Sequence, residues 1–244
     1  MQNPGGGTAD TLVPVLDYST ADTYGYLVNS YAGGGHDVSL YKFSDSSPPG
    51  ALIGANVATP SYIPAQPAVQ KGSSGVVVDT GSAAITQAVN YTYGMYATLT
   101  NGFVNSGGVA NILWMKFNPN TQTAVNYGQL YDSSLAYFDS SISEESNGST
   151  MYTYAVSGPT IYPSSAMAGM NVNNMFLENQ YVHQGAYPTP QTGSKTCSGL
   201  PCSRWGDFTS TYTDYSVNNN ALWSASQDMA NSSLWGTVIA YASA

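Results

Sequence analysis

The sequence predicts an all-β protein, and three of its features carry that prediction. Apolar residues recur with the period of a β-strand along short runs, while helical periodicity is almost absent. Clusters of Gly, Pro, Asn, Asp and Ser, which favour turns, separate the runs. The chain of 244 residues also contains 20 Tyr and is 12% aromatic, and aromatic residues are frequent in strands. We therefore expect many short strands and enough chain to bury a sizeable core.

The expected strands follow one another along most of the chain. Each is a run of apolar residues bounded by turn signals. In chain order, the runs are residues 11–18, 24–32, 37–43, 83–89, 93–99, 111–117, 149–156, 221–226 and 235–242.

Part of this strand pattern is repeated. The segment TYGYLVNSY, which begins at Thr23, resembles TYGMYATLT, which begins at Thr92, and the next strands end alike in LYKF and WMKF. Two further units pair STMYTYAVSG with YPSSAMAGM, and NALWSAS with WGTVIAYA. Repeated antiparallel units of this kind are typical of a β-propeller. We therefore expect residues 1–244 to form a single β-propeller domain of four or more antiparallel blades, with a β-sandwich or jelly roll as the alternative.

The C-terminal half resembles a known family. SRWGDFTSTYTDYSVNNNALWSAS, followed by SSLWGTVIAYA, is similar to the last blade of secreted bacterial sialidase-like propellers. YFDSSISEESNGSTMYTYAVSGPTIYPSSAMA resembles the blade before it, so the likeness covers residues 130–244 well and the first half only loosely. The resemblance implies that residues 204–226 close a ring of blades, with Trp205 and Phe208 packed between sheets and Asp207 bound to turn amides. Four units imply a small ring, or a chain that is part of a larger one.

The resemblance does not extend to sialidase activity. Sialidases clamp the substrate carboxylate with three arginines, and a bidentate guanidinium is hard to replace by lysine. This chain has one arginine, Arg204, and lacks the Asp-box pattern S-x-D-x-G-x-x-W.

Charge and hydropathy exclude several further classes of function. Charged residues make up 8% of the chain and the net charge is -9. Five cations cannot form a basic stripe, which excludes nucleic acid and anionic lipid as partners. No run of 18 apolar residues is present, so no membrane-spanning helix is expected. The N-terminus shows no signal peptide, so for a secreted protein we expect that its signal has been removed.

The two cysteines indicate the compartment. Cys197 and Cys202 are separated by a short segment that contains Gly and Pro. A disulfide there would suit a secreted, extracellular or periplasmic protein, and two free thiols are the alternative. A zinc site would need more ligands, and His36 and His183 lie far away in the sequence.

Candidate catalytic residues are few. Glycoside hydrolysis needs two carboxyl groups across the scissile bond. Glu178 follows Met, Phe and Leu, an apolar setting that would raise its pKa. Asp17 and Asp139 stand at strand ends, where acids face the central channel of distantly similar five-bladed glycosidases. We expect Glu178 with Asp139 or Asp17 as the candidate acid and base; alternatively, both aspartates cap turns and Glu178 lies on an exposed loop.

Other sets of residues give weaker indications of function. Glu144 and Glu145 precede Asn-Gly, which predicts a solvated hairpin tip. No G-x-S-x-G elbow supports a serine hydrolase, and only His183 with Asp207 could be combined with a serine. No cofactor is expected except calcium, for which the Asn-rich turns 171–174 and 214–220 offer oxygen ligands; such turns also simply favour positive φ.

Aromatic and amide side chains in loops are the remaining signal. Neutral sugars stack on aromatic faces and bind hydroxyl and amide groups, and Tyr162, Tyr181, Tyr187 and Trp205 are the loop aromatics available for this. The sequence thus predicts an extracellular protein that binds or cleaves neutral glycans, as a glycoside hydrolase with paired carboxylates if it is an enzyme. The alternative is a structural or adhesion protein that self-associates into a surface layer or filament.

Overall fold

The protein is all-β in its computed structural model, as the sequence predicts. The structure describes residues 3, 7–9, 11–20, 23–44, 51–73, 75–102, 108–206, 209–214, 216 and 221–243. Within these ranges there are eighteen strands and no helix, hence no helix that could cross a membrane. The strands are β1 (Val13–Asp17), β2 (Tyr24–Asn29), β3 (Gly35–Ser44), β4 (Ile53–Tyr62), β5 (Val77–Val78), β6 (Ile85–Tyr91), β7 (Gly94–Asn101), β8 (Asn111–Asn118), β9 (Thr123–Leu130), β10 (Ala136–Glu144), β11 (Thr150–Gly158), β12 (Ile161–Met170), β13 (Phe176–His183), β14 (Thr196–Cys197), β15 (Leu200–Ser203), β16 (Ser210–Asp214), β17 (Ala221–Met229) and β18 (Trp235–Ser243).

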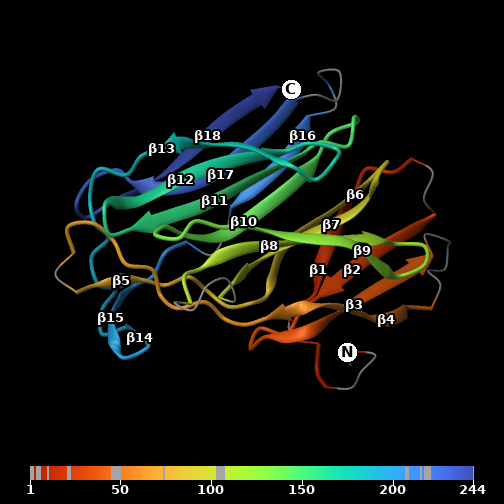
Figure 1. Ribbon diagram of the computed structural model, residues 1–244, viewed down its shortest axis with the longest axis horizontal. Coiled ribbons are helices and arrows are strands. Elements are labelled where there is room, and N and C mark those ends of the chain that lie inside the picture. Colours follow the sequence, from red (N-terminus) through yellow and green to blue (C-terminus); the bar gives the residue numbers. More distant parts are fainter. Residues whose placement is uncertain are drawn as a thin grey trace.

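The first half of the chain forms one curved sheet of eight strands (Figure 1). Its order is β4-β3-β2-β1-β6-β7-β8-β9. Neighbours within β1–β4 and within β6–β9 are antiparallel, and the two groups join through parallel pairing of β1 with β6, where Val15 lies opposite Ala88. The edge strands β4 and β9 contact each other, so the sheet is nearly closed and barrel-like.

The second half adds layers on the outside of this curved sheet. Strands β10–β13 form a four-stranded antiparallel sheet that contacts β6, β7 and β8, and β16–β18 form a three-stranded sheet that packs on its other face (Figure 1). The side-chain amide of Gln87 on β6 joins all three layers, because it donates hydrogen bonds to the carbonyls of Ile142 on β10 and Thr211 on β16, at 2.7 and 2.8 Å.

The sequence repeat corresponds to four antiparallel meanders, but the structure does not confirm a propeller. The meanders are β1–β4, β6–β9, β10–β13 and β16–β18, which contain the matching segments in order. The first two merge into a single sheet through the β1–β6 pair instead of standing as separate blades. Local alternation specifies strands but not which distant strand each one joins, so the sequence could not indicate this merger.

Strand alternation divides the core into two main layers. Along β7, Met95, Ala97 and Leu99 point into the curved sheet, whereas Tyr96 points outward toward β10–β13. Successive side chains of a strand face opposite ways, so a strand buried on both sides contributes to both layers.

Small hydroxyl residues line the interface between the second and third layers. The hydroxyls of Ser141 and Thr211 lie 2.7 Å apart, and those of Ser143 and Thr213 lie 2.6 Å apart. At one end of the interface Trp205 is buried and its ring meets that of Phe138 edge-on, with 6.5 Å between centroids. The structure therefore places Trp205 between sheets, as the family resemblance implies; Asp207 and Phe208 lie outside the described residues.

The predicted disulfide is present. Cys197 and Cys202 are bonded, with 2.05 Å between sulfurs, and they join the β14–β15 hairpin. Strand β15 pairs in parallel with β5, and the Lys195 ammonium lies 2.8 Å from the Asp79 carboxylate. The disulfide closes the hairpin itself, while the β15–β5 pairing and the ion pair hold it against the segment that contains β5.

Candidate functional site

The three predicted catalytic carboxylates lie on three different strands. Asp17, at the end of β1, is exposed, and its carboxylate accepts hydrogen bonds from the Ser19 amide and the Asn90 side chain. Asp139, in β10, has a positive φ of 50°, and its buried backbone bonds to Thr100 and Thr209. These contacts place the two aspartates in different regions. Glu178 lies in β13, and its side chain is outside the described part.

Trp205 is set apart from the other three predicted ligand-binding aromatics, because they do not line the cavity that it borders. Tyr181 and Tyr187 are exposed, and the ring of Tyr162 contacts the Lys71 ammonium at 4.9 Å. Trp205 is only 3% exposed, yet it borders a cavity of about 790 Å³ on the C-terminal sheet, which none of the three tyrosines lines.

Two other expectations concern histidine and calcium. His183 approaches the carboxylate of Asp228 on β17 through Nδ1, whereas Asp207 lies outside the described residues.

In the turn 171–174, predicted as a possible calcium site, the Asn171 side-chain oxygen already accepts hydrogen bonds from the amides of Asn173 and Met175, which is a turn-capping role. The turn 214–220 is only partly described, so calcium binding stays a prediction.

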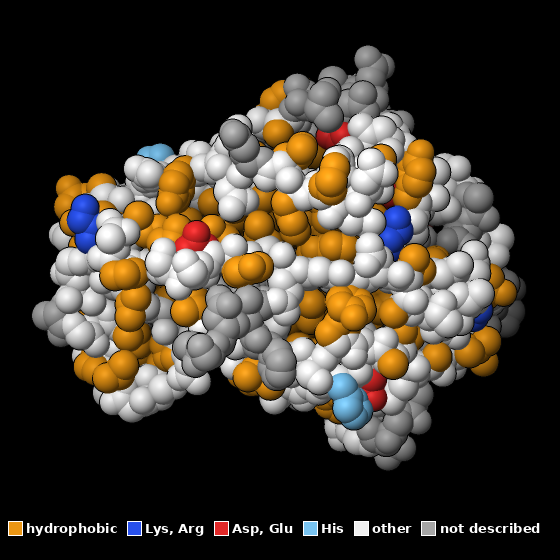
Figure 2. All heavy atoms as spheres, viewed as in Figure 1, with side chains coloured by type: hydrophobic (Ala, Val, Ile, Leu, Met, Phe, Trp, Pro, Cys, Tyr) orange, Lys and Arg blue, Asp and Glu red, His pale blue; other side chains and the backbone are white. Residues whose placement is uncertain are grey.

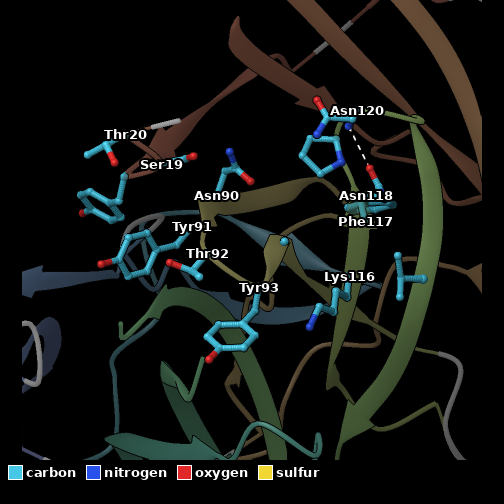
Figure 3. A pocket seen from close by; sticks show the side chains of 14 residues that line it. Ser19, Thr20, Asn90, Tyr91, Thr92, Tyr93, Lys116, Phe117, Asn118 and Asn120 are labelled. Carbon is cyan, nitrogen blue, oxygen red and sulfur yellow. Dashed lines mark hydrogen bonds between the residues drawn. The ribbon is translucent and has the colours of Figure 1, made fainter. Parts of the chain in front are cut away.

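A larger cavity lies where β1, the β6–β7 hairpin and the β8–β9 turn meet (Figure 3). Its volume is about 970 Å³. Hydroxyl groups, amides and tyrosine rings line it, together with the apolar side chains of Phe117, Pro119 and Val125 and a single lysine. The lining residues that matter below are Tyr18, Tyr91, Tyr93, Asn90, Asn120 and Lys116. Such a cavity offers hydrogen bonds, ring faces and one positive charge to a small ligand.

Glu144, at the end of β10, is buried behind this cavity, and the prediction of a solvated hairpin tip is wrong. Glu144 is 0% exposed and Glu145 is 1% exposed. The Asn147 side chain donates a hydrogen bond to the Glu145 carboxylate, whereas neither Glu144 side-chain oxygen has a described partner at normal distance. Asn-Gly does form the turn, but the strand before it packs against the curved sheet, and Glu144 and Glu145 are therefore buried.

The electrostatics of Glu144 follow from that burial. Desolvation raises its pKa from 4.5 to about 8, while Lys116 and the nearby Tyr93 amide oppose the shift. Lys116 lies opposite Tyr96 on the neighbouring strand, with its ammonium 4.8 Å from the ring centroid. Burial lowers the pKa of Lys116 and raises that of Tyr96. At neutral pH Glu144 is therefore mostly protonated.

A row of aromatic side chains leads from the cavity onto the outer face of the C-terminal sheet. We call Tyr91, Tyr18, Tyr212, Trp223 and Tyr241 the aromatic row. Ring centroids lie 6.3 Å apart for Tyr91–Tyr18, 5.9 Å for Tyr18–Tyr212 and 5.1 Å for Trp223–Tyr241. Tyr212 and Trp223 lie directly opposite each other on β16 and β17.

The outer half of this row is open to solvent. Tyr212, Trp223 and Tyr241 are 50%, 42% and 48% exposed, which is unusual for three large rings side by side. The Trp223 indole nitrogen donates a hydrogen bond to Asp214 at 3.2 Å, which orients its ring. Figure 2 shows one face of the molecule, where orange side chains gather in bands and charged ones are few and scattered.

Sequence reasoning missed both Glu144 and the row, although a signal existed for each. Glu144 follows Ile142 by two residues, so it continues the apolar face of β10. Tyr212, Trp223 and Tyr241 alternate with buried or half-buried residues on strands of the last meander, but only the register shows that they form one line.

Comparison with known proteins adds no identity. No family model matches the chain, and no curated protein matches it either.

Proposed function

We propose that the protein is an extracellular module that binds a polysaccharide along the aromatic row, with one part of the chain in the cavity at the β6–β7 hairpin. The observation that carries the proposal is the row itself, whose exposed rings continue into a cavity of hydroxyl and amide groups. The disulfide supports an extracellular setting. Kinship with secreted sialidase-like propellers, inferred from the sequence resemblance over residues 130–244, stays part of the proposal.

The spacing of the row suits a polymer of sugars. Neighbouring strands lie about 4.8 Å apart, which is close to the length of one pyranose unit. Rings on β16, β17 and β18 therefore present one stacking face per sugar. Low charge around the row fits a ligand held by stacking and hydrogen bonds.

We propose binding and not cleavage as the primary activity. The expected pairing of Glu178 with Asp139 or with Asp17 stays a prediction, because the Glu178 side chain lies outside the described part. An assay for new reducing ends on any bound polymer tests this point, and release of sugars would make the module a hydrolase.

Replacement of Trp223 by alanine tests the proposed function. We expect affinity for a bound polysaccharide to fall at least ~10-fold, because a central aromatic anchor is lost. Trp235→Ala is the matched control, since Trp235 is 68% exposed on the same sheet but outside the row; its affinity should change less than ~2-fold. Affinity electrophoresis against a panel of soluble polysaccharides measures both, and equal losses in the two variants would contradict the row as the binding site.

The ring orientations predict which physical form of a polymer is bound. The ring planes of Trp223 and Tyr241 make an angle of 58°, and those of Tyr18 and Tyr212 make an angle of 78°, so the rings of the row do not lie in one plane. A flat crystal face cannot contact tilted rings together, whereas a single twisted chain can. We expect pull-down of the protein by amorphous or soluble polymer and little by its crystalline form; preference for crystalline material would contradict this.

A second candidate is self-association through the same sheet. Leu234, Trp235 and Ile239 are 60%, 68% and 68% exposed on β18 or just before it, and exposed apolar surface favours association. Sedimentation across a range of concentrations tests this. If the native chain forms larger assemblies at higher concentration and Trp235→Ala does not, the structural role is favoured.

A further inference from the structure

We propose that the cavity at the β6–β7 hairpin binds an anionic sugar unit, one that carries a carboxylate or a sulfate, through the ammonium group of Lys116. The inference rests on the proposed function in one respect, since it specifies the substrate class of the same site. It concerns the cavity, to which the aromatic row contributes Tyr18 and Tyr91, and not the solvent-exposed half of the row.

The first observation is where the charge lies. Lys116 is the only charged residue among the described residues that line the cavity. The chain has five lysines and arginines against fourteen acids. Lys116 therefore supplies the charge by which this cavity would attract an anion, as Arg204 does in the cavity that Trp205 borders.

The second observation is that Lys116 has no acidic partner within 4.0 Å in the described part of the chain, where the ion pairs involve other residues. Its ammonium rests over the Tyr96 ring, and burial destabilises its charged form. A half-buried ammonium is stabilised by an anion that also accepts hydrogen bonds. A ligand carboxylate or sulfate in the cavity would supply both.

The nearest internal acid does not neutralise Lys116 at neutral pH. Glu144 is fully buried and lacks a described hydrogen-bond partner, and its pKa is raised to about 8. Because its neutral form predominates near pH 7, the positive charge of Lys116 remains available to a ligand.

The rest of the cavity favours a sugar over a bare anion. Tyr93 is 50% exposed and offers a ring face, and Figure 3 shows Tyr93 in the β6–β7 turn and Lys116 on β8 at this cavity. Ser19, Thr20 and Asn120 add hydroxyl and amide groups. Together they match a ring with several hydroxyls and one negative group.

Monosaccharide binding tests the inference without the polymer. Glucose, glucuronic acid and glucose 6-sulfate are titrated at low ionic strength, with the shifts of backbone amides 90–94 as the signal. We expect one or both anionic sugars to bind at least ~10-fold more tightly than glucose, because a charge-assisted hydrogen bond replaces a neutral one. The anionic sugar that binds more tightly shows whether the cavity prefers a carboxylate or a sulfate.

Three variants isolate Lys116. Lys116→Met should remove the preference for the anionic sugars, and Lys116→Arg should retain most of it. Lys71→Met is the matched control, because Lys71 contacts a tyrosine ring at a similar 4.9 Å but lies outside the cavity lining. Equal binding of all three sugars, or an unchanged preference in Lys116→Met, would overturn the inference.

The two proposals fail in different ways. Trp223→Ala should weaken polymer binding and leave the monosaccharide preference intact, since Trp223 does not line the cavity. Absence of polymer binding with the preference intact contradicts only the polysaccharide proposal. Polymer binding without the preference contradicts only the role of Lys116.

Discussion

The Glu144→Gln variant is expected to be more stable than the native chain in alkaline solution. Burial raises the pKa of Glu144 from 4.5 to about 8, so the folded state favours the protonated acid. Below the unfolded pKa the acid is neutral in both states. As pH rises above it, the unfolded chain loses the proton while the folded chain keeps it, and native stability falls until the pH passes about 8.

Glutamine is uncharged at every pH and removes this dependence. Between pH 4.5 and pH 8 or so, the free energy of unfolding of Glu144→Gln should rise relative to that of the native chain by roughly 4 kcal/mol. Urea denaturation at a series of pH values measures it. Lys116 and Tyr96 face Glu144 and are present in both proteins, and because the Glu144 charge raises the pKa of each, the measured difference includes this coupling.

Glu145→Gln is the control for this prediction. Glu145 is equally buried, but Asn147 donates a hydrogen bond to it, and its pKa is raised by burial against that bond. Glu145→Gln should therefore also gain free energy of unfolding relative to the native chain as pH rises, but by less than Glu144→Gln. Parallel pH profiles for the native chain and Glu144→Gln would show that Glu144 ionises normally in the folded state.

Trp205→Ala is expected to lower the free energy of unfolding by about 3–5 kcal/mol, the usual range for a large aromatic removed from a core. The Trp205 ring is 3% exposed and packs with Phe138 and Met229, where the second and third layers meet. Its loss leaves a cavity that rigid sheets cannot close. Chemical denaturation followed by tyrosine fluorescence measures the effect.

The same variant separates two roles that the sequence assigned to this residue. Trp205→Phe keeps an apolar ring and should lose less than half as much stability as Trp205→Ala. If Trp205→Ala unfolds like the native chain but loses glycan affinity, Trp205 is a ligand-binding residue and not a part of the core.

The sequence predicted the local features because they depend on neighbours in the chain. Alternation over residues 93–99 and 111–117 corresponds to β7 and β8, and the repeat between Thr23 and Thr92 corresponds to two successive meanders. Cys197 and Cys202 are close in sequence, so their disulfide could be expected from spacing and composition. Strand period and short loops are encoded locally.

Features that depend on distant contacts were not predictable in this way. The parallel β1–β6 pair merges two meanders into one sheet, and no local pattern specifies that partner. Glu178, Asp139 and Asp17 were grouped by chemical type, but the described contacts of the two aspartates place them in different regions. Tyr162, Tyr181 and Tyr187 were chosen as loop aromatics, whereas the continuous row came from Tyr18, Tyr212 and Trp223.

By itself, the sequence determined that the chain is an all-β protein of repeated antiparallel units with too little positive charge for a basic binding stripe, and it favoured a disulfide over two free thiols. Only the tertiary structure decided that Glu144 is buried beside Lys116 and that exposed rings from separate strands form one line into a cavity. The physical reason is that burial and the resulting charge state depend on how one sheet packs on another. Those contacts join residues that are far apart in the chain.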